Sequence, residues 1–246
     1  MIVADRLLPL LGILLLVCAW EISIVVFELP PYILPPLSSI GGEIWQDKAL
    51  LLDALGVTLY EAGTGFVIGA ILGVALGMLA TIAPSFERSV MPVVVAINSV
   101  PIVAYVPVAL IAFGMGPSSK IVMVVLAVGF TVFLSSVQGL LGTDRNMVNL
   151  LRSFGAGPLR VTWSYRLPAA LPTIISALRV SVVRAMIVAI VAEMLGAYAG
   201  LGRLIYESTQ QIDFLRTWAA ITVASAASVS LYTLFAWADH RLVWWK

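Results

Sequence analysis

The sequence contains few charged residues, one histidine and one cysteine. Of its 246 residues, 11% are charged and 61% are hydrophobic, the formal net charge is +1, and the mean hydropathy is +1.05. This composition lies far outside the range of soluble domains and indicates an integral membrane protein. The near-neutral charge gives no reason to expect a nucleic-acid partner. The single His240 excludes a histidine-cluster metal site, so we expect no bound metal, and the lone Cys18 excludes an intrachain disulfide.

Motifs of nucleotide hydrolysis and of several other enzyme classes are missing. The sequence has no Gly-x-x-x-x-Gly-Lys-Ser/Thr phosphate-binding loop, no Gly-x-Ser-x-Gly and no His-Glu-x-x-His. We therefore expect a chain that is not itself an enzyme and carries no cofactor, so any ATP-driven step would use a separate ATPase chain. The sequence also lacks a clear internal repeat, which disfavours a self-sufficient secondary transporter built from inverted halves.

Long apolar runs dominate what is present. They predict an all-α, polytopic membrane protein that forms a single transmembrane domain over residues 1–246. The six predicted spans cover about 7–27, 54–82, 90–113, 121–141, 169–196 and 217–238. The first run is too long for the apolar part of a signal peptide and no Ala-x-Ala cleavage pattern follows it, so we expect an uncleaved span. A short interfacial helix is predicted around residues 40–48.

The second predicted span contains four glycines that repeat every fourth residue. They are Gly65, Gly69, Gly73 and Gly77, which lie near one face of a helix. In lipid there is no hydrophobic drive between helices, so small residues that permit close backbone contact mark a packing surface. The pattern therefore predicts a structural helix–helix contact rather than a transport site.

The third predicted span contains Pro92, Pro101 and Pro107. Each proline removes a backbone donor and bends a helix, which is tolerable in a membrane only where neighbours or water satisfy the freed carbonyls. Broken helices of this kind commonly line cavities, so part of this run either faces a solute path or packs on a neighbour. The polar candidates for a solute path here and at the end of the fourth span are Asn98, Tyr105 and Gln138.

The fifth predicted span carries Arg179, Arg184 and Glu193. Charges inside a span are expensive and usually face the protein interior or water, so Arg184 and Glu193 are further candidates for the solute path. On an ideal helix these two residues point to opposite faces, so their partners must come from other helices. Glu21 and Glu61 are candidate partners. Alternatively, Arg184 attracts an anion.

Residues 143–168 form the longest polar and basic interval of the chain. Thr143 or Asp144 can begin a helix by accepting an otherwise unpaired backbone N–H, and Gly155 suits the left-handed position at its end. The apolar residues at helical spacing are Met147, Val148, Leu150, Leu151 and Phe154, and the polar residues between them are Arg145, Asn149 and Arg152. This amphipathic helix needs a partner for its apolar face, either its own membrane domain or another protein.

The stretch 149–168 resembles the cytoplasmic loop of ABC importer permeases. The family pattern is Glu-Ala-Ala, three residues, Gly, nine residues, Ile, any residue, Leu-Pro. Here Gly155 and Leu167-Pro168 match it with the same spacing. Asn149-Leu150-Leu151 replaces Glu-Ala-Ala and Tyr165 replaces Ile, so the contact with an ATPase is expected to differ locally.

Other stretches resemble the nitrate, sulfonate and taurine branch of the same family. They are Pro101 with Pro107, the Phe-Gly-Met-Gly run at 113–116, and Ala-Glu-Met at 192–194 followed by Gly-Leu-Gly at 200–202. Residues 58–66 also follow the family pattern, although Glu61 stands where an arginine is expected. Together these matches cover nearly the whole chain.

The resemblance implies the permease subunit of an ATP-driven importer for a small solute such as a sulfonate, taurine, nitrate or a vitamin-like compound. It implies a second permease copy that completes a homodimer, a cytoplasmic ATPase dimer that binds ATP and Mg, and an extracytoplasmic solute-binding protein. The location would be a prokaryotic plasma (inner) membrane. By this resemblance a coupling helix lies between the fourth and fifth spans, with contact residues Asp144, Arg145, Asn149, Leu150, Leu151, Arg152, Phe154, Gly155, Leu167 and Pro168.

The distribution of basic residues predicts that both termini are cytoplasmic. With six spans and the 143–168 loop in the cytoplasm, the basic residues on that side are Arg6, Arg88, Arg145, Arg152, Arg160, Arg166, Arg241 and Lys246. Those on the opposite side are Lys48, Lys120, Arg203 and Arg216. This excess of positive charge on one side is typical of the cytoplasmic side of membrane proteins.

Two other functional classes remain as alternatives. One is an ion-coupled secondary carrier or channel that acts without an ATPase, with Arg184, Glu193 and Glu61 as its working charges. The other is an intramembrane enzyme acting on lipids, which is disfavoured because no nucleophile motif or pair of carboxylates is evident at a membrane face.

Overall fold

The computed structural model describes residues 2–242, and all regular elements within this range are helical, which confirms the predicted all-α fold. The helices in order are α1 (Ile2–Val26), α2 (Leu37–Gln46), α3 (Lys48–Ile82), α4 (Pro84–Asn98), η1 (Ile102–Tyr105), α5 (Val106–Phe113), α6 (Pro117–Leu141), α7 (Arg145–Ser153), α8 (Pro158–Val161), the π-helical turn η2 (Thr162–Arg166), α9 (Leu167–Gly196), α10 (Leu201–Gln210) and α11 (Phe214–Leu242).

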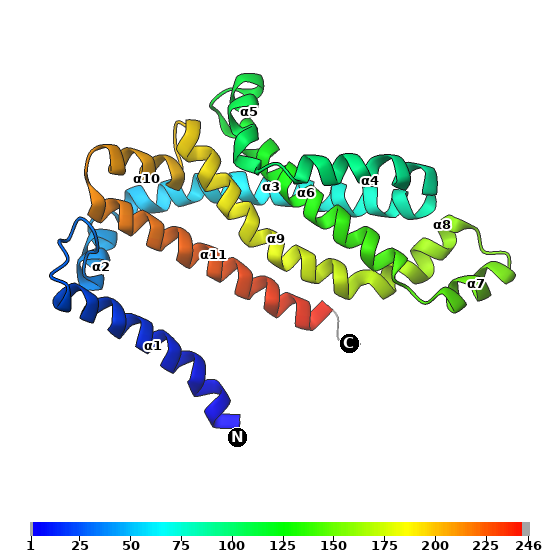
Figure 1. The fold of residues 1–246 in the computed structure, drawn as a ribbon, viewed down its shortest axis with the longest axis horizontal. Helices are drawn as coiled ribbons and strands as arrows, with labels where there is room; N and C mark the ends of the chain where they lie inside the picture. Colours follow the sequence, from blue (N-terminus) through cyan, green and yellow to red (C-terminus); the bar gives the residue numbers. More distant parts are fainter. Residues whose placement is uncertain (1, 243–246) are drawn as a thin grey trace.

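The long helices α3, α6 and α9 pack together and form the centre of the molecule, and α11 packs on α9 (Figure 1). Helices α7 and α8 lie at one end of this bundle, and α2 and α10 lie at the opposite end (Figure 1). The main hydrophobic core lies between the three central helices, where Val124, Val128 and Met186 are fully buried. The two ends of the bundle therefore carry different short helices, α7 and α8 at one end and α2 and α10 at the other (Figure 1).

Helix α1 is joined to the remaining helices near its C-terminal end. The Trp20 indole N–H donates to the Pro35 carbonyl at 3.1 Å, and the Trp20 and Trp218 rings meet edge to face with centroids 5.1 Å apart. The Glu21 carboxylate accepts a hydrogen bond from the Leu37 N–H at 2.9 Å. These contacts fix α1 beside α2 and the start of α11.

The four regularly spaced glycines lie on the face of α3 that contacts α6. A Cβ added at Gly65 would lie 2.5 Å from the Val124 Cβ, and one at Gly77 would lie 2.6 Å from the Ser136 Cβ. At Gly69 and Gly73 such an atom would come within 2.9 Å of backbone carbonyl oxygens of α6. The helices approach so closely that only hydrogen fits at these positions. The spacing of four thus corresponds to one packing surface along α3.

The third predicted span is broken rather than continuous. Helix α4 and the η1–α5 segment meet at an angle of 92° across the break before Pro101. Residues before a proline are biased away from helical geometry, so the chain leaves α4 at Asn98 and restarts at Ile102. Pro107 lies in the first turn of α5, where a missing N–H costs nothing, and Pro92 lies inside α4.

The fifth predicted span begins earlier than its prolines indicate. Residues Pro158–Gly196 form one helical segment of 39 residues. The Leu167 N–H donates to the Thr162 carbonyl across the π-helical turn η2, which carries the helix into Pro168 without a break. The helix therefore starts at Pro158, before the predicted start of the span at residue 169. The connection between the predicted spans 169–196 and 217–238 contains a helix, α10.

Four described helices are long and apolar enough to cross a membrane, and the bent pair α4 with η1–α5 gives a fifth candidate. The four are α3, the Pro158–Gly196 segment, α6 and α11. The remaining predicted span, residues 7–27, falls on α1, in which Leu14–Val26 is a shorter apolar helix among the residues described. The chain is thus a helical membrane protein with a short helix, α7, between α6 and the Pro158–Gly196 segment.

Candidate functional site

Helix α7 begins and ends at distinct capping residues. The Asp144 side chain accepts a hydrogen bond at 2.9 Å from the backbone N–H two residues further on, as an N-cap does. Gly155 has a φ of +81°, in the left-handed region that favours glycine. Its N–H donates to the Arg152 carbonyl at 2.9 Å. The next N–H, of Ala156, donates to the Leu151 carbonyl at 3.1 Å, which completes a Schellman motif.

The apolar residues of α7 divide between two surfaces. Val148 is only 4% exposed and packs toward the rest of the chain. Met147, Leu150 and Phe154 are 41%, 48% and 79% exposed, and Leu151 is half-buried. The predicted polar contact residues Arg145, Asn149 and Arg152 are exposed. The helix thus buries Val148 within the chain and presents uncovered apolar side chains outward.

A pocket of about 310 Å³ lies behind α7, with three arginines in its wall. Its lining residues are Leu141, Thr143, Arg145, Val148, Asn149, Arg152 and Arg166. The Arg166 Nε is buried without a hydrogen-bond partner, and none of the salt bridges within residues 2–242 involves these arginines. Arg166 was not among the predicted contact residues, although it directly precedes Leu167-Pro168. Leu167 is half-buried and Pro168 exposed, both on the continuous helix.

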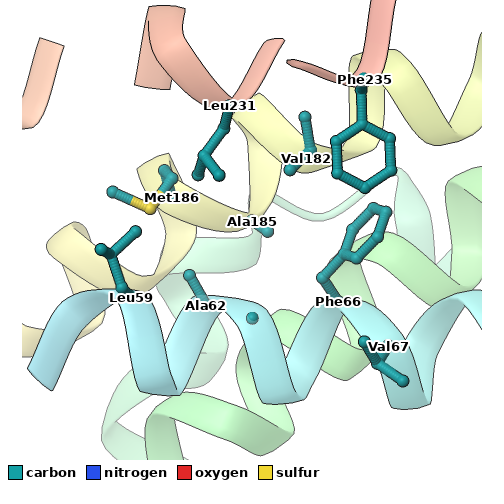
Figure 2. Close-up of a pocket in the computed structure, with 10 residues that line it drawn as sticks. Leu59, Ala62, Phe66, Val67, Val182, Ala185, Met186, Leu231 and Phe235 are labelled. Atoms are coloured by element: carbon teal, nitrogen blue, oxygen red, sulfur yellow. The ribbon is translucent and has the colours of Figure 1, made fainter. Parts of the chain in front are cut away.

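An apolar cavity lies between α3, α9 and α11 (Figure 2). This cavity has a volume of about 230 Å³, and its lining side chains are all apolar. The Phe66 and Phe235 rings face each other across it edge to face, with centroids 5.3 Å apart, and Met186 and Leu231 close another side (Figure 2). The cavity offers no side-chain hydrogen bond to a polar solute.

The five residues predicted for a solute path do not meet in one site. None of them lines the apolar cavity. Asn98 and Gln138 are exposed on α4 and α6, and the Tyr105 hydroxyl donates to the Ile97 carbonyl at 3.2 Å. Glu193 is fully buried. Tyr105 therefore contacts the residue beside Asn98, whereas Glu193 lies in a different, fully buried environment.

The two arginines of α9 find partners on other helices, as their spacing predicts. Arg184 donates to the Thr131 hydroxyl of α6 at 2.9 Å. Arg179 donates to the Tyr232 hydroxyl at 2.7 Å and lies over its ring, 4.8 Å from the centroid. It also forms a 3.9 Å salt bridge with Asp239 of α11. Most of these partners are hydroxyl groups rather than carboxylates.

The predicted pairing of these arginines with Glu21 or Glu61 is wrong. The salt bridges within the described chain contain neither glutamate. Glu21 instead accepts from the α2 backbone, and Glu61 lies beside Glu193 at the end of the bundle opposite α7. The error arose because the partner of a charge inside a span depends on how helices pack, which the linear sequence does not reveal.

Residues 50–244 match the model of one protein family, described as the binding-protein-dependent transport system inner membrane component. The chain belongs to this family. It is therefore a transmembrane permease of an ABC importer for small solutes and a multi-pass protein of the plasma membrane. The family assignment agrees with the loop pattern at 149–168.

Curated relatives extend over most of the permease. A "Probable ABC transporter permease protein" of Haemophilus influenzae is 32% identical over 236 residues, which is 96% of each chain. A formylaminopyrimidine transport permease protein of Halalkalibacterium halodurans is 30% identical over 97% of this chain and 95% of its own. A taurine transport system permease protein of Escherichia coli is 29% identical over 76% of this chain and 67% of its own. These similarities support the sulfonate, taurine and nitrate branch.

A solved structure supports the fold. The chain is similar to an inward-facing MetNI methionine ABC transporter structure with a TM-score of 0.68, at 21% identity, over 80% of this chain and 96% of that one. At this identity the similarity concerns the arrangement of helices alone.

The Ala-Glu-Met and Gly-Leu-Gly stretches of the permease meet at the start of α10. Glu193 Oε2 accepts hydrogen bonds from the Gly202 N–H at 2.6 Å and from the Thr58 hydroxyl at 3.1 Å. The Thr58 hydroxyl in turn accepts a hydrogen bond from the Leu201 N–H at 2.9 Å. Gly200 has a φ of +108°, and a Cβ there would collide with the Glu193 carboxyl group. The glycines therefore leave room for a carboxylate that caps α10 from α9.

Proposed function

We propose that this permease couples to a separate cytoplasmic ATPase dimer through α7, and that ATP and Mg bind to that partner. The observation that supports this most strongly is the outward apolar surface of α7, formed by Met147, Leu150 and Phe154. An amphipathic helix that presents exposed apolar anchors at helical spacing is suited to lie in a groove of another protein. The basic pocket behind α7 would add affinity for acidic side chains at the edge of that groove.

The structure also offers a route by which movement of α7 would reach the membrane. Three residues separate α7 from the end of α6, and the helical segment Pro158–Gly196 follows after a short turn. A helix of 39 residues spans about 58 Å at 1.5 Å per residue, enough to cross the bilayer. Closure of the ATPases on nucleotide would shift α7 and, through these two connections, α6 and α9. This would bias the permease between inward-open and outward-open states.

The complete transporter would contain two copies of this chain and an extracytoplasmic solute-binding protein. We propose that both termini lie in the cytoplasm, because this places α7 and most basic residues on the ATPase side. The solute class is a sulfonate, taurine, nitrate or a vitamin-like compound. The names of the relatives, which mention formylaminopyrimidine and taurine, support a small polar solute.

Gentle purification of the permease from its native membrane, followed by mass spectrometry, tests the coupling proposal. We expect a stoichiometric ATPase with phosphate-binding loop motifs to accompany the wild-type chain. Phe154→Asp should lose it, because a carboxylate would enter an apolar groove. Tyr198→Asp is the matched control, since Tyr198 is also 79% exposed but lies beyond α9 at the opposite end of the bundle.

Two results would overturn the proposal. One is retention of the ATPase by Phe154→Asp at the level of the Tyr198→Asp control, which would separate α7 from ATPase binding. The other is a chain that is purified alone and moves solute into liposomes without ATP, which would favour an ion-coupled carrier or channel.

A further inference from the structure

The permease buries three ionisable side chains together at the end opposite α7. Glu61 of α3 is 2% exposed, and Glu193 of α9 and Lys120 of α6 are fully buried. If all three were ionised, the site would hold one uncompensated negative charge. Such a charge inside a membrane protein is strongly unfavourable, so the site must either find another cation or bind a proton.

The ammonium group of Lys120 is directed at backbone carbonyls. It donates to the Met115 carbonyl at 2.6 Å, to the Gly116 carbonyl at 3.2 Å and to the Gly196 carbonyl at the end of α9. An ammonium has three N–H donors, and these bonds use all of them. Lys120 therefore contributes positive charge to the site but supplies no hydrogen bond to either glutamate.

One oxygen of Glu193 is fully satisfied. Its Oε2 accepts the Gly202 N–H and the Thr58 hydroxyl at the start of α10. Donors of this kind, at a helix N-terminus, favour the ionised form of a carboxyl group. We therefore assign the negative charge of the site to Glu193.

Each of the two glutamates has one buried oxygen without a hydrogen-bond donor. Glu193 Oε1 and Glu61 Oε2 are both buried without a hydrogen-bond partner. The two carboxyl groups are neighbours, because Thr58, which donates to Glu193 Oε2, lies one turn before Glu61 on the same face of α3. Two ionised carboxylates in contact repel, and neither can donate to the other. A single proton between them removes the repulsion and satisfies both oxygens at once.

We propose that Glu61 and Glu193 form a proton-binding site that holds one proton between Glu61 Oε2 and Glu193 Oε1 at neutral pH. Glu61 is then a carboxylic acid that donates to the Glu193 carboxylate, and with the Lys120 ammonium the site is electrically neutral. The charged groups acting on Glu61 are Glu193 from α9 and Lys120 from α6, while α10 contributes its first amides. The proton joins α3 to α9 beside α10, so loss of the proton would weaken that packing.

This inference is independent of the ATPase coupling, because it concerns side chains at the other end of the bundle. Infrared spectroscopy of the purified full-length permease in lipid nanodiscs tests it directly. At pH 7 the wild-type spectrum minus that of Glu61→Gln should show the C=O absorption of one carboxylic acid. Asp53→Asn, which removes an exposed carboxylate from the same helix, should show no such difference.

The pH dependence of thermal unfolding gives a second measurement. The folded pair keeps a proton that an unfolded glutamate releases near its ordinary pKa of about 4.3. Above that pH the folding equilibrium constant of the wild type should fall up to tenfold per pH unit until the pair releases its proton. In Glu61→Gln the amide N–H replaces the donor without titrating, so this part of the pH dependence should vanish.

The proposal is overturned if the Glu61→Gln difference spectrum lacks a carboxylic acid absorption and wild type and variant unfold with parallel pH curves. That result would mean that both glutamates are ionised and that Lys120 alone compensates them. Should Glu61→Gln not fold, infrared titration of the unsubstituted permease still decides the matter. One carboxylic acid absorption must then disappear between neutral and alkaline pH, and a spectrum unchanged over this range contradicts the proposal.

Discussion

A Cβ atom at position 65 of α3 would lie 2.5 Å from the Cβ of Val124 on α6, and 2.9 Å from the Ile121 carbonyl oxygen. Contacts this short cannot be relieved by rotating a side chain, because the Val124 Cβ and the carbonyl are tied to the backbone of α6. The separation of α3 and α6 is therefore set by glycine, and the hydrophobic core between the two helices depends on it.

Gly65→Ala should destabilise the permease by about 1–3 kcal/mol, the usual cost of adding a methyl group to a fully packed core. Thermal unfolding in nanodiscs measures this. Gly56→Ala is the matched control, because Gly56 lies on the same helix and a Cβ there meets nothing within 4 Å. The control should be neutral or slightly stabilising, since alanine favours helix over glycine. Equal stability of the two variants would contradict the tight packing of α3 on α6.

Gly155→Val should loosen the end of α7 through the backbone rather than through a steric clash. A Cβ at this position would meet nothing within 4 Å, but the φ of +81° is strongly disfavoured for a β-branched residue and costs about 1–3 kcal/mol. We expect faster hydrogen exchange of the Ala156 amide and, if α7 couples to an ATPase, ATP hydrolysis without matching uptake. Gly155→Asn should behave nearly as wild type, because asparagine tolerates this conformation. If Gly155→Val shows the same hydrogen exchange and the same coupling of ATP hydrolysis to uptake as the wild type, the left-handed cap at Gly155 is not important for either property.

The features that the sequence predicts best are those with a local physical cause. The two ends of α7, at Asp144 and Gly155, could be predicted because capping depends on the residue itself and on a few neighbouring amides. The glycine spacing on α3 predicts a packing face because the helical period is fixed. By contrast, the break before Pro101 and the unbroken helix through Pro168 show that a proline allows several outcomes, and its neighbours decide among them.

Contacts between distant residues could not be predicted. Arg184 bonds to Thr131, and Glu61 lies beside a second glutamate rather than an arginine. A sequence shows that a buried charge needs compensation, yet the compensating group comes from whichever helix packs there. The role of Lys120 was missed for the same reason, because its three acceptors are backbone carbonyls that leave no side-chain signature.

Thr58→Val should destabilise the start of α10. Valine has nearly the shape of threonine but leaves the buried Leu201 N–H without its acceptor and removes a donor to Glu193. An unsatisfied buried group costs about 1–3 kcal/mol, so the unfolding temperature should fall. Thr58→Ser keeps the hydroxyl and should recover most of the loss. If serine and valine are equally destabilising, packing of the methyl group is the important contribution and the hydrogen bonds are not.

Arg216→Gln should destabilise the permease more at neutral than at acidic pH. The Arg216 guanidinium lies 2.7 Å from Asp47, 3.3 Å from Asp213 and 3.8 Å from Glu43, and so joins α11 to the α2 region. Burial raises the pKa of the Glu43 carboxyl above its ordinary value, and Asp47 raises it further. Since these side chains are partly exposed, we expect a loss of about 1–2 kcal/mol at neutral pH.

The sign of the pH dependence follows from the charges that remain. Without Arg216, the attraction that lowers the pKa of Glu43 is lost, so burial and the nearby Asp47 and Asp213 hold the folded pKa of the Glu43 carboxyl further above its unfolded value. Stability is then fully present at low pH and is lost as pH rises through the folded pKa of Glu43, so the deficit should shrink toward about pH 5. Arg203→Gln, which breaks only a single, partly exposed pair with Glu207 within one helix, should cost less than about 0.5 kcal/mol at any pH. A deficit of Arg216→Gln that is constant from acidic to neutral pH would show that lost packing, rather than the charge balance of this cluster, destabilises the variant.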